Sequence, residues 1–124
     1  MSSKNIILRK IGSFYQVFDN DAYIINYLFS YKINNYKCGF PISAIEKVKN
    51  ELNNKKINYV IKEEQEIKMD FKKENKYNSY LKKSLENYNI NLKIQEVINS
   101  LKELEPEKIK KILKSIEEQI NNYK

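Results

Sequence analysis

The apolar pattern of the chain changes its period near residue 71, and this change limits the folds that the chain can adopt. Before that point, short β-branched or aromatic runs at residues 6–8, 14–18, 57–63 and 66–72 are combined with two helical stripes. After it, apolar residues recur only at helical spacing, as far as residue 123. The pattern predicts an α/β (α+β) domain over residues 1–71. Residues 72–124 are predicted to form a helical extension.

Local signals place the helices within these two regions. Acidic and amide residues before a helical stripe predict a helix over residues 21–31. Ser43 and Glu46 have the spacing of a capping box and predict the start of a second helix, which extends to residue 56. Between these helices, residues 33–41 carry turn signals and are expected to form a loop or a short edge strand. Asp19 and Asp21 are interpreted as helix-capping residues.

The helical extension is predicted to contain one helix and a helical hairpin. The first helix carries Tyr77, Leu81 and Leu85 and is expected to break at residues 87–91. Two further stripes, separated by Pro106, then form the hairpin. Its second helix is predicted to contact a protein partner through Ile109, Ile112, Ile116 and Ile120. The same stripe would equally serve a hairpin that folds back on its own sheet.

Charge and composition favour a cytoplasmic protein with affinity for polyanions. The 124 residues carry 23 basic and 16 acidic side chains, a net charge of +7, which attracts nucleic acid through phosphate neutralisation. Codons rich in A and T favour lysine in any protein and could also produce this excess of basic residues. The net charge alone therefore leaves nucleic-acid binding open. One cysteine excludes an internal disulfide, no signal peptide is recognised, and the apolar runs are too short to span a membrane.

Several catalytic chemistries are absent from the composition. The sequence contains no histidine, which excludes Ser/His and Cys/His catalysis and zinc sites built from cysteine and histidine. Its two glycines, Gly12 and Gly39, cannot form a glycine-rich phosphate loop. Cys38 is interpreted as a buried small apolar residue. We therefore expect a protein that is not an enzyme and that has no cofactor and no metal.

The strand at residues 14–18 has no clearly polar face. Side chains alternate along a strand, so Phe14, Gln16 and Phe18 point to one face, and Tyr15 and Val17 to the other. This pattern is compatible with cover on both faces.

Three separated blocks of sequence occur in the order found in a known domain. The matching residues are Gly12, Phe14, Tyr15, Phe18, Asp21 and Ala22, then Gly39, Phe40, Pro41 and Ala44, then residues 59–61 with Glu64 and Gln65. Over about residues 8–70, the chain resembles the N-terminal mismatch-recognition domain, domain I, of the MutS DNA mismatch repair family. In that family the domain is a small mixed sheet flanked by helices, in which a phenylalanine wedges into the minor groove and stacks on a mispaired base.

The resemblance implies a role for particular residues of this chain. Phe14 would be the wedge, inserted where the base stack is already disrupted and unstacking is least costly. Gln16 stands where the family has glutamate, so it keeps a hydrogen bond but no charge. Arg9 and Lys10, which precede this strand, complete the expected nucleic-acid-binding set. The ATPase parts of a mismatch repair protein are not expected here.

Two functional hypotheses follow from these patterns. Stand-alone proteins similar to this domain act as accessory partners of reverse transcriptases in diversity-generating retroelements. The first hypothesis is therefore a non-enzymatic, MutS-like accessory protein that binds RNA or distorted DNA together with such a polymerase, with homo-oligomerisation left open. The alternative is a protein-interaction adaptor, or an inhibitor encoded by a phage or plasmid, which binds a protein partner through the helical hairpin.

Overall fold

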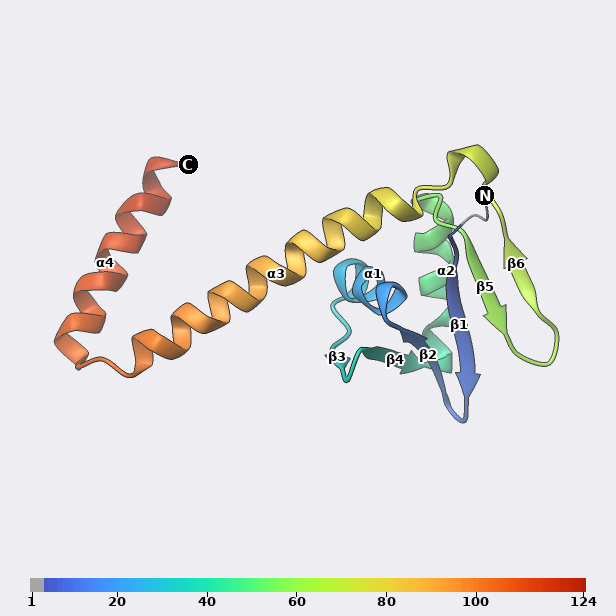
Figure 1. Ribbon diagram of the computed structural model, residues 1–124, viewed down its shortest axis with the longest axis horizontal. Coiled ribbons are helices and arrows are strands. Elements are labelled where there is room, and N and C mark those ends of the chain that lie inside the picture. Colours follow the sequence, from blue (N-terminus) through green and yellow to red (C-terminus); the bar gives the residue numbers. More distant parts are fainter. Residues whose placement is uncertain (1–3) are drawn as a thin grey trace. The chain divides into compact units, whose positions relative to one another are not determined.

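The computed structural model describes residues 4–124, which form a mixed sheet and four α-helices (Figure 1). The chain divides into two compact units, the first ending at Tyr88 and the second comprising Asn89–Lys124. The predicted fold class, a mixed sheet with helices and further helix at the C-terminus, is confirmed.

The first unit contains all of the strands. They are β1 (Ile6–Ile11), β2 (Phe14–Phe18), β3 (Ile33–Asn34), β4 (Lys37–Pro41), β5 (Tyr59–Lys62) and β6 (Ile67–Met69). Helices α1 (Asn20–Phe29) and α2 (Ile45–Asn54) belong to the same unit, with 3₁₀ turns at Ile42–Ala44 and Lys72–Glu74. The long helix α3 (Tyr77–Lys102) begins in the first unit and ends in the second, which also contains α4 (Pro106–Asn122).

The six strands lie in the order β3-β4-β2-β1-β5-β6. Strands β1 and β5 are parallel, and every other pair is antiparallel. A parallel pair needs a crossover connection, and the segment that contains α2 runs from β4 past β2 and β1 to β5. Residues 33–41, expected to be a loop or short edge strand, form the outer strand β3 and the interior strand β4, because β4 pairs with both β2 and β3.

One face of the sheet carries the hydrophobic core. Tyr15 stacks on Phe40, which lies opposite it on β4, with 5.8 Å between ring centroids. Tyr31, after α1, also stacks on Phe40, with 5.6 Å between ring centroids. The core is completed by buried residues of the sheet and of both short helices: Ile6, Leu8, Val17, Ala22, Ile24, Ile25, Val48, Leu52, Tyr59 and Ile61. Helices α1 and α2 therefore cover this face.

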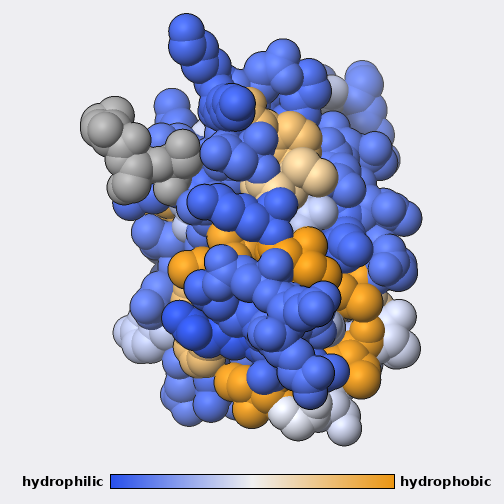
Figure 2. Space-filling view, turned by 90° about the vertical axis from the view of Figure 1, so that its right-hand side faces the viewer, coloured by the Kyte–Doolittle hydropathy of each residue, from blue (hydrophilic) through white to orange (hydrophobic). Residues whose placement is uncertain are grey.

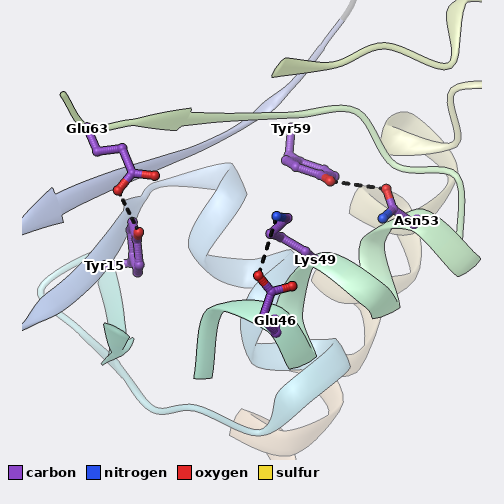
Figure 3. A network of polar contacts seen from close by, with 6 residues as sticks. All are labelled: Tyr15, Glu46, Lys49, Asn53, Tyr59 and Glu63. Atoms are coloured by element: carbon purple, nitrogen blue, oxygen red, sulfur yellow. Dashed lines mark hydrogen bonds and ion pairs between the residues drawn. The ribbon is translucent and has the colours of Figure 1, made fainter. Parts of the chain in front are cut away.

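Two tyrosine hydroxyl groups form hydrogen bonds at the margin of the core, and one of these bonds joins the sheet to α2. Figure 3 shows Tyr59 of β5 and Asn53 of α2 pointing toward each other, and the tyrosine hydroxyl donates a hydrogen bond to Asn53 Oδ1 at 3.1 Å. The Tyr15 hydroxyl donates in the same way to Glu63 Oε2 at 3.1 Å (Figure 3). Both tyrosines thus bury their rings while their hydroxyl groups remain hydrogen-bonded, as buried tyrosines require.

The helix starts differ from their predicted capping. Ser43 lies inside the 3₁₀ turn, and α2 begins at Ile45 without a side-chain capping bond, so the predicted capping box is wrong. Asp19 occupies the N-cap position of α1 with a positive φ of 54° and also makes no side-chain capping bond. Asp21 has a different role, because its Oδ2 accepts a hydrogen bond from the Ile7 backbone N–H at 3.0 Å.

The predicted helix break at residues 87–91 is wrong, because α3 is continuous from Tyr77 to Lys102. This segment contains asparagine but neither glycine nor proline, and asparagine lowers helix propensity by less than about 1 kcal/mol per residue. The first turns of α3 also belong to the domain, since Tyr77 and Ser84 are buried. The first compact unit consequently ends at Tyr88 and not at the predicted boundary after residue 71.

Strand β6 is more exposed than its alternating sequence predicts. Because Ile67 and Met69 alternate with the polar Lys68, they are expected on the buried face of the strand, yet they are 41% and 36% exposed. The reason is position, because β6 is the outermost strand at its end of the sheet. On the side of the molecule that carries β5 and β6, Figure 2 shows apolar surface among polar side chains.

Candidate nucleic-acid interface

The second face of the sheet, which we call the open face, carries the candidate interface. Residues directly opposite each other on paired strands point to the same face. The strand pairing therefore assigns thirteen positions to the open face: Ile7, Arg9, Ile11, Phe14, Gln16, Phe18, Asn34, Lys37, Gly39, Pro41, Val60, Lys62 and Lys68. Among these described positions only Val60 is buried.

Two phenylalanine rings are exposed on the open face. Phe14 is 50% exposed and lies between Ile11 of β1 and Pro41 of β4. Phe18 is 38% exposed and lies opposite Lys37. Exposed aromatic rings on a sheet surface offer their π-faces to a flat ligand, which the buried rings of Tyr15 and Phe40 cannot do.

A polar row crosses the open face between the two phenylalanines. Lys62, Arg9, Gln16 and Gly39 lie side by side on β5, β1, β2 and β4. Gly39 contributes no side chain, although a Cβ at this position would make ordinary contacts of 3.5 Å with Tyr15 O and 3.7 Å with Gln16 Cγ. The backbone therefore does not require glycine here. The absence of a side chain at Gly39 leaves the surface beside Gln16 flat.

The open face is basic. Its strand positions include Arg9, Lys37, Lys62 and Lys68 and no acidic residue. Lys62 is engaged by Glu66, whose Oε2 lies 2.6 Å from its Nζ, and this bond and charge lower the pKa of the Glu66 carboxyl. Among residues 4–124, neither Arg9 nor Lys37 forms an ion pair, so both cations are available to an anion.

The structure brings together three of the four residues predicted from the sequence. Arg9 lies directly opposite Gln16. Phe14 precedes Gln16 by two residues on β2 and points to the same face of the sheet. Lys10 lies opposite the buried Tyr15 and therefore leaves the sheet on the covered side. There it lines a hollow of about 660 Å³ together with Glu63 and Glu64, whose negative charges oppose the binding of an anion.

Sequence reasoning alone missed part of this face. Strand alternation already placed Phe18 on the same face as Phe14, so the second exposed ring could have been predicted from the sequence. Lys37, Gly39 and Lys62 come from other strands, and only the register of β4 and β5 brings them to the polar row or its flank.

The predicted partner-binding residues lie in the second unit, on α4. Ile112, Ile116 and Ile120 are 39%, 37% and 50% exposed, and Ile109 is partly exposed. Within α4, all of whose residues the structure describes, none is buried. These four residues recur at helical spacing along α4.

The one cysteine of the chain has a structural role. Cys38 is buried, its Sγ–H donates to Tyr31 O at 3.5 Å, and burial raises the pKa of the thiol to about 11. Such a thiol stays protonated at neutral pH and is a poor nucleophile. Over residues 4–124, no group of three or more acidic or cysteine side chains is placed to hold a metal ion.

Comparison with known proteins adds no relative. No protein-family model matches the chain, and a search of curated proteins finds no match. The resemblance to MutS domain I therefore stays a prediction from the sequence. In the part of the chain that the structure describes, no helix is both long enough and apolar enough to cross a membrane.

Proposed function

We propose that this protein is a nucleic-acid-binding module whose open face receives unpaired bases of RNA or of distorted DNA. The observation that carries the proposal is the juxtaposition of Phe14 with Arg9 and Gln16 on one exposed face. A base stacked on an exposed aromatic ring contributes about 1–3 kcal/mol to binding. Arg9 and Lys37 would contact phosphates, and the Gln16 amide can donate and accept hydrogen bonds at a base edge.

The spacing of the two rings favours an unpaired strand over a regular duplex. Phe14 and Phe18 are four residues apart on β2, which corresponds to about 13 Å at the usual rise per strand residue. Stacked bases in a duplex are only ~3.4 Å apart. The rings would therefore contact two bases that are not stacked on each other, as in a single strand or a bulge.

The proposed role is binding and not catalysis. It is compatible with the MutS-like wedge at Phe14 and with an accessory role beside a reverse transcriptase, both of which rest on the resemblance. In such a role, the open face would hold nucleic acid while another surface contacts the polymerase.

A second candidate function, binding of a protein partner, is favoured by a different observation. The apolar stripe of α4 is exposed and lies on the other compact unit. Exposed apolar surface of this kind commonly marks a protein-binding site. An adaptor or inhibitor of this type would use α4 and would not need the open face.

Fluorescence anisotropy with labelled oligonucleotides distinguishes the two functions. Single-stranded RNA, single-stranded DNA, a bulged duplex and a regular duplex of the same sequence are titrated between about 50 and about 200 mM salt. The proposal predicts tighter binding to the single strands and the bulge than to the regular duplex, and affinity that falls steeply with salt. Absence of binding to every oligonucleotide at the lowest salt would contradict the proposal and favour the protein-binding function.

A further inference from the structure

Helix α4 carries an apolar stripe that needs a cover. The stripe recurs every three or four residues and consists of Ile109, Ile112, Leu113, Ile116 and Ile120. Leu113 is 43% exposed and Ile120 50% exposed. Short helices gain most of their stability in water from packing of such a face. An additional surface should therefore cover this stripe.

The charges of α4 are divided along its length. The first part contains one acidic residue, Glu107, and four basic residues, Lys108, Lys110, Lys111 and Lys114, whereas the second part contains only the acidic residues Glu117 and Glu118. None of these side chains forms an ion pair with any residue in the described range 4–124. A basic half followed by an acidic half is complementary to the same helix running in the opposite direction.

The position of two of these charges strengthens the match. Lys110 follows Ile109, and Glu117 follows Ile116, so both lie on the same flank of the stripe, two turns apart. In an antiparallel pair of identical helices related by a two-fold axis, equivalent flanks face each other. With the axis near Leu113, Lys110 lies level with the partner's Glu117, and Glu117 with the partner's Lys110.

We propose that a second copy of this chain covers α4, through an antiparallel α4–α4 pair centred near Leu113. The apolar stripes of the two helices would pack against each other, with the two Lys110–Glu117 ion pairs beside them. A parallel pair would bring the Lys110 flank against the flank that carries Lys108 at nearly the same height, which is repulsive. The charge pattern therefore selects the antiparallel arrangement.

An alternative cover is the end of α3 within the same chain. Val97 of α3 is 47% exposed, and a hollow of about 370 Å³ is lined by Val97, Leu101 and Leu104 together with Ile112 of α4. The hollow shows that the two helices of this unit leave apolar surface exposed between them. Closure of the hollow within one chain would leave the protein monomeric, which the following experiment detects.

Sedimentation equilibrium of the full-length protein over a range of concentrations tests the proposal. We expect a monomer–dimer equilibrium. Lys110→Glu should weaken the dimer about 5- to 30-fold, because two ion pairs are lost by symmetry. The double reversal Lys110→Glu with Glu117→Lys should restore it. A protein that is monomeric at every concentration overturns the proposal, and so does a dimer that is insensitive to Lys110→Glu or that the double reversal fails to restore.

Cysteine cross-linking of the full-length chain tests the register separately, because native Cys38 is buried. Near the two-fold axis, a residue meets its own copy, whereas a residue near the helix end does not. Leu113→Cys should therefore form a disulfide-linked dimer under mild oxidation, and Ile120→Cys, on the same stripe, should not. Equal cross-linking at both positions would indicate a parallel pair and overturn the antiparallel arrangement.

Discussion

The Tyr77 hydroxyl of α3 donates a hydrogen bond to Asp21 Oδ1 in the first turn of α1. The other carboxylate oxygen, Oδ2, accepts a hydrogen bond from the Ile7 backbone N–H of β1 at 3.0 Å. One side chain thus connects a strand and two helices that are far apart in the sequence. Burial raises the pKa of this carboxyl, although both hydrogen bonds act in the opposite direction.

The raised pKa of Asp21 predicts how stability depends on pH. The folded protein holds this proton to higher pH than the unfolded chain, in which an aspartate has a pKa of about 3.9. The associated stabilisation is complete below about pH 3.9 and is lost as the pH rises through the folded pKa. The free energy of unfolding of the wild type, relative to Asp21→Asn, should therefore fall as the pH rises from about 4. Urea unfolding of both proteins from about pH 4 upward measures this difference in the free energy of unfolding. A difference that increases with pH would contradict a raised pKa of Asp21.

The first turns of α3 are predicted to be part of the folding unit. Tyr77 is 4% exposed, and Asn75 accepts a hydrogen bond from the Asn58 N–H at 3.0 Å. Loss of a buried aromatic side chain alone costs about 3–5 kcal/mol, comparable to the whole stability of a marginal domain. A chain ending at Tyr88 should show a cooperative thermal transition by circular dichroism, and a chain ending at Phe71 should not. A cooperative transition in the shorter chain would place the domain boundary at the position predicted from the sequence.

The sequence was sufficient for the elements whose pattern is local. Short β-branched or aromatic runs identified β2 and β5, and the stripe of Val48 and Leu52 identified α2. The capping box at Ser43 and the helix break at residues 87–91 failed because each relied on one local preference worth about 1 kcal/mol. In the structure, the 3₁₀ turn and the continuous α3 override these preferences.

The candidate site was predictable only along one strand. Phe14, Gln16 and Phe18 share a face by alternation, but nothing in that strand says which face the helices cover. The pairing of β1 with β2 places Arg9 and Lys10 on opposite faces of the sheet. The register of β4 against β2 places Lys37 and Gly39 on the open face. These pairings are long-range and leave no local signal in the sequence.

The side chains of Arg9 and Lys10 point to opposite faces of the sheet, which makes the two residues a matched pair for testing the open face. Arg9→Gln removes a phosphate contact in our proposal, so nucleic-acid affinity should fall, and the slope of log affinity against log salt should decrease by about one. Lys10→Gln removes the same formal charge from the covered side, beside Glu63 and Glu64, and should change neither quantity by a comparable amount. Anisotropy titrations at several salt concentrations compare them. Equal effects of the two changes would indicate non-specific attraction by net charge.

The flat surface at Gly39 is predicted to be a requirement of binding and not of folding. A Cβ there would meet its neighbours at ordinary contact distances, so Gly39→Ala and Gly39→Val should both fold, with thermal midpoints no lower than that of the wild type by circular dichroism. The branched valine should hinder a base beside Gln16 and weaken binding about fivefold or more, whereas alanine should have a smaller effect. Wild-type affinity in Gly39→Val would show that no ligand approaches this position.

The ring of Phe14 tests the central claim most directly. Phe14→Leu keeps an apolar side chain but removes the π-face, and Phe14→Tyr keeps the ring. Because Phe14 is 50% exposed, neither change should greatly alter the free energy of unfolding measured in urea.

Affinity for a single-stranded oligonucleotide, measured by anisotropy for the wild type, Phe14→Leu and Phe14→Tyr, decides the matter. We predict that Phe14→Leu binds about 5- to 150-fold more weakly and that Phe14→Tyr binds like the wild type. Wild-type affinity in a correctly folded Phe14→Leu protein would contradict the proposal that the open face binds bases.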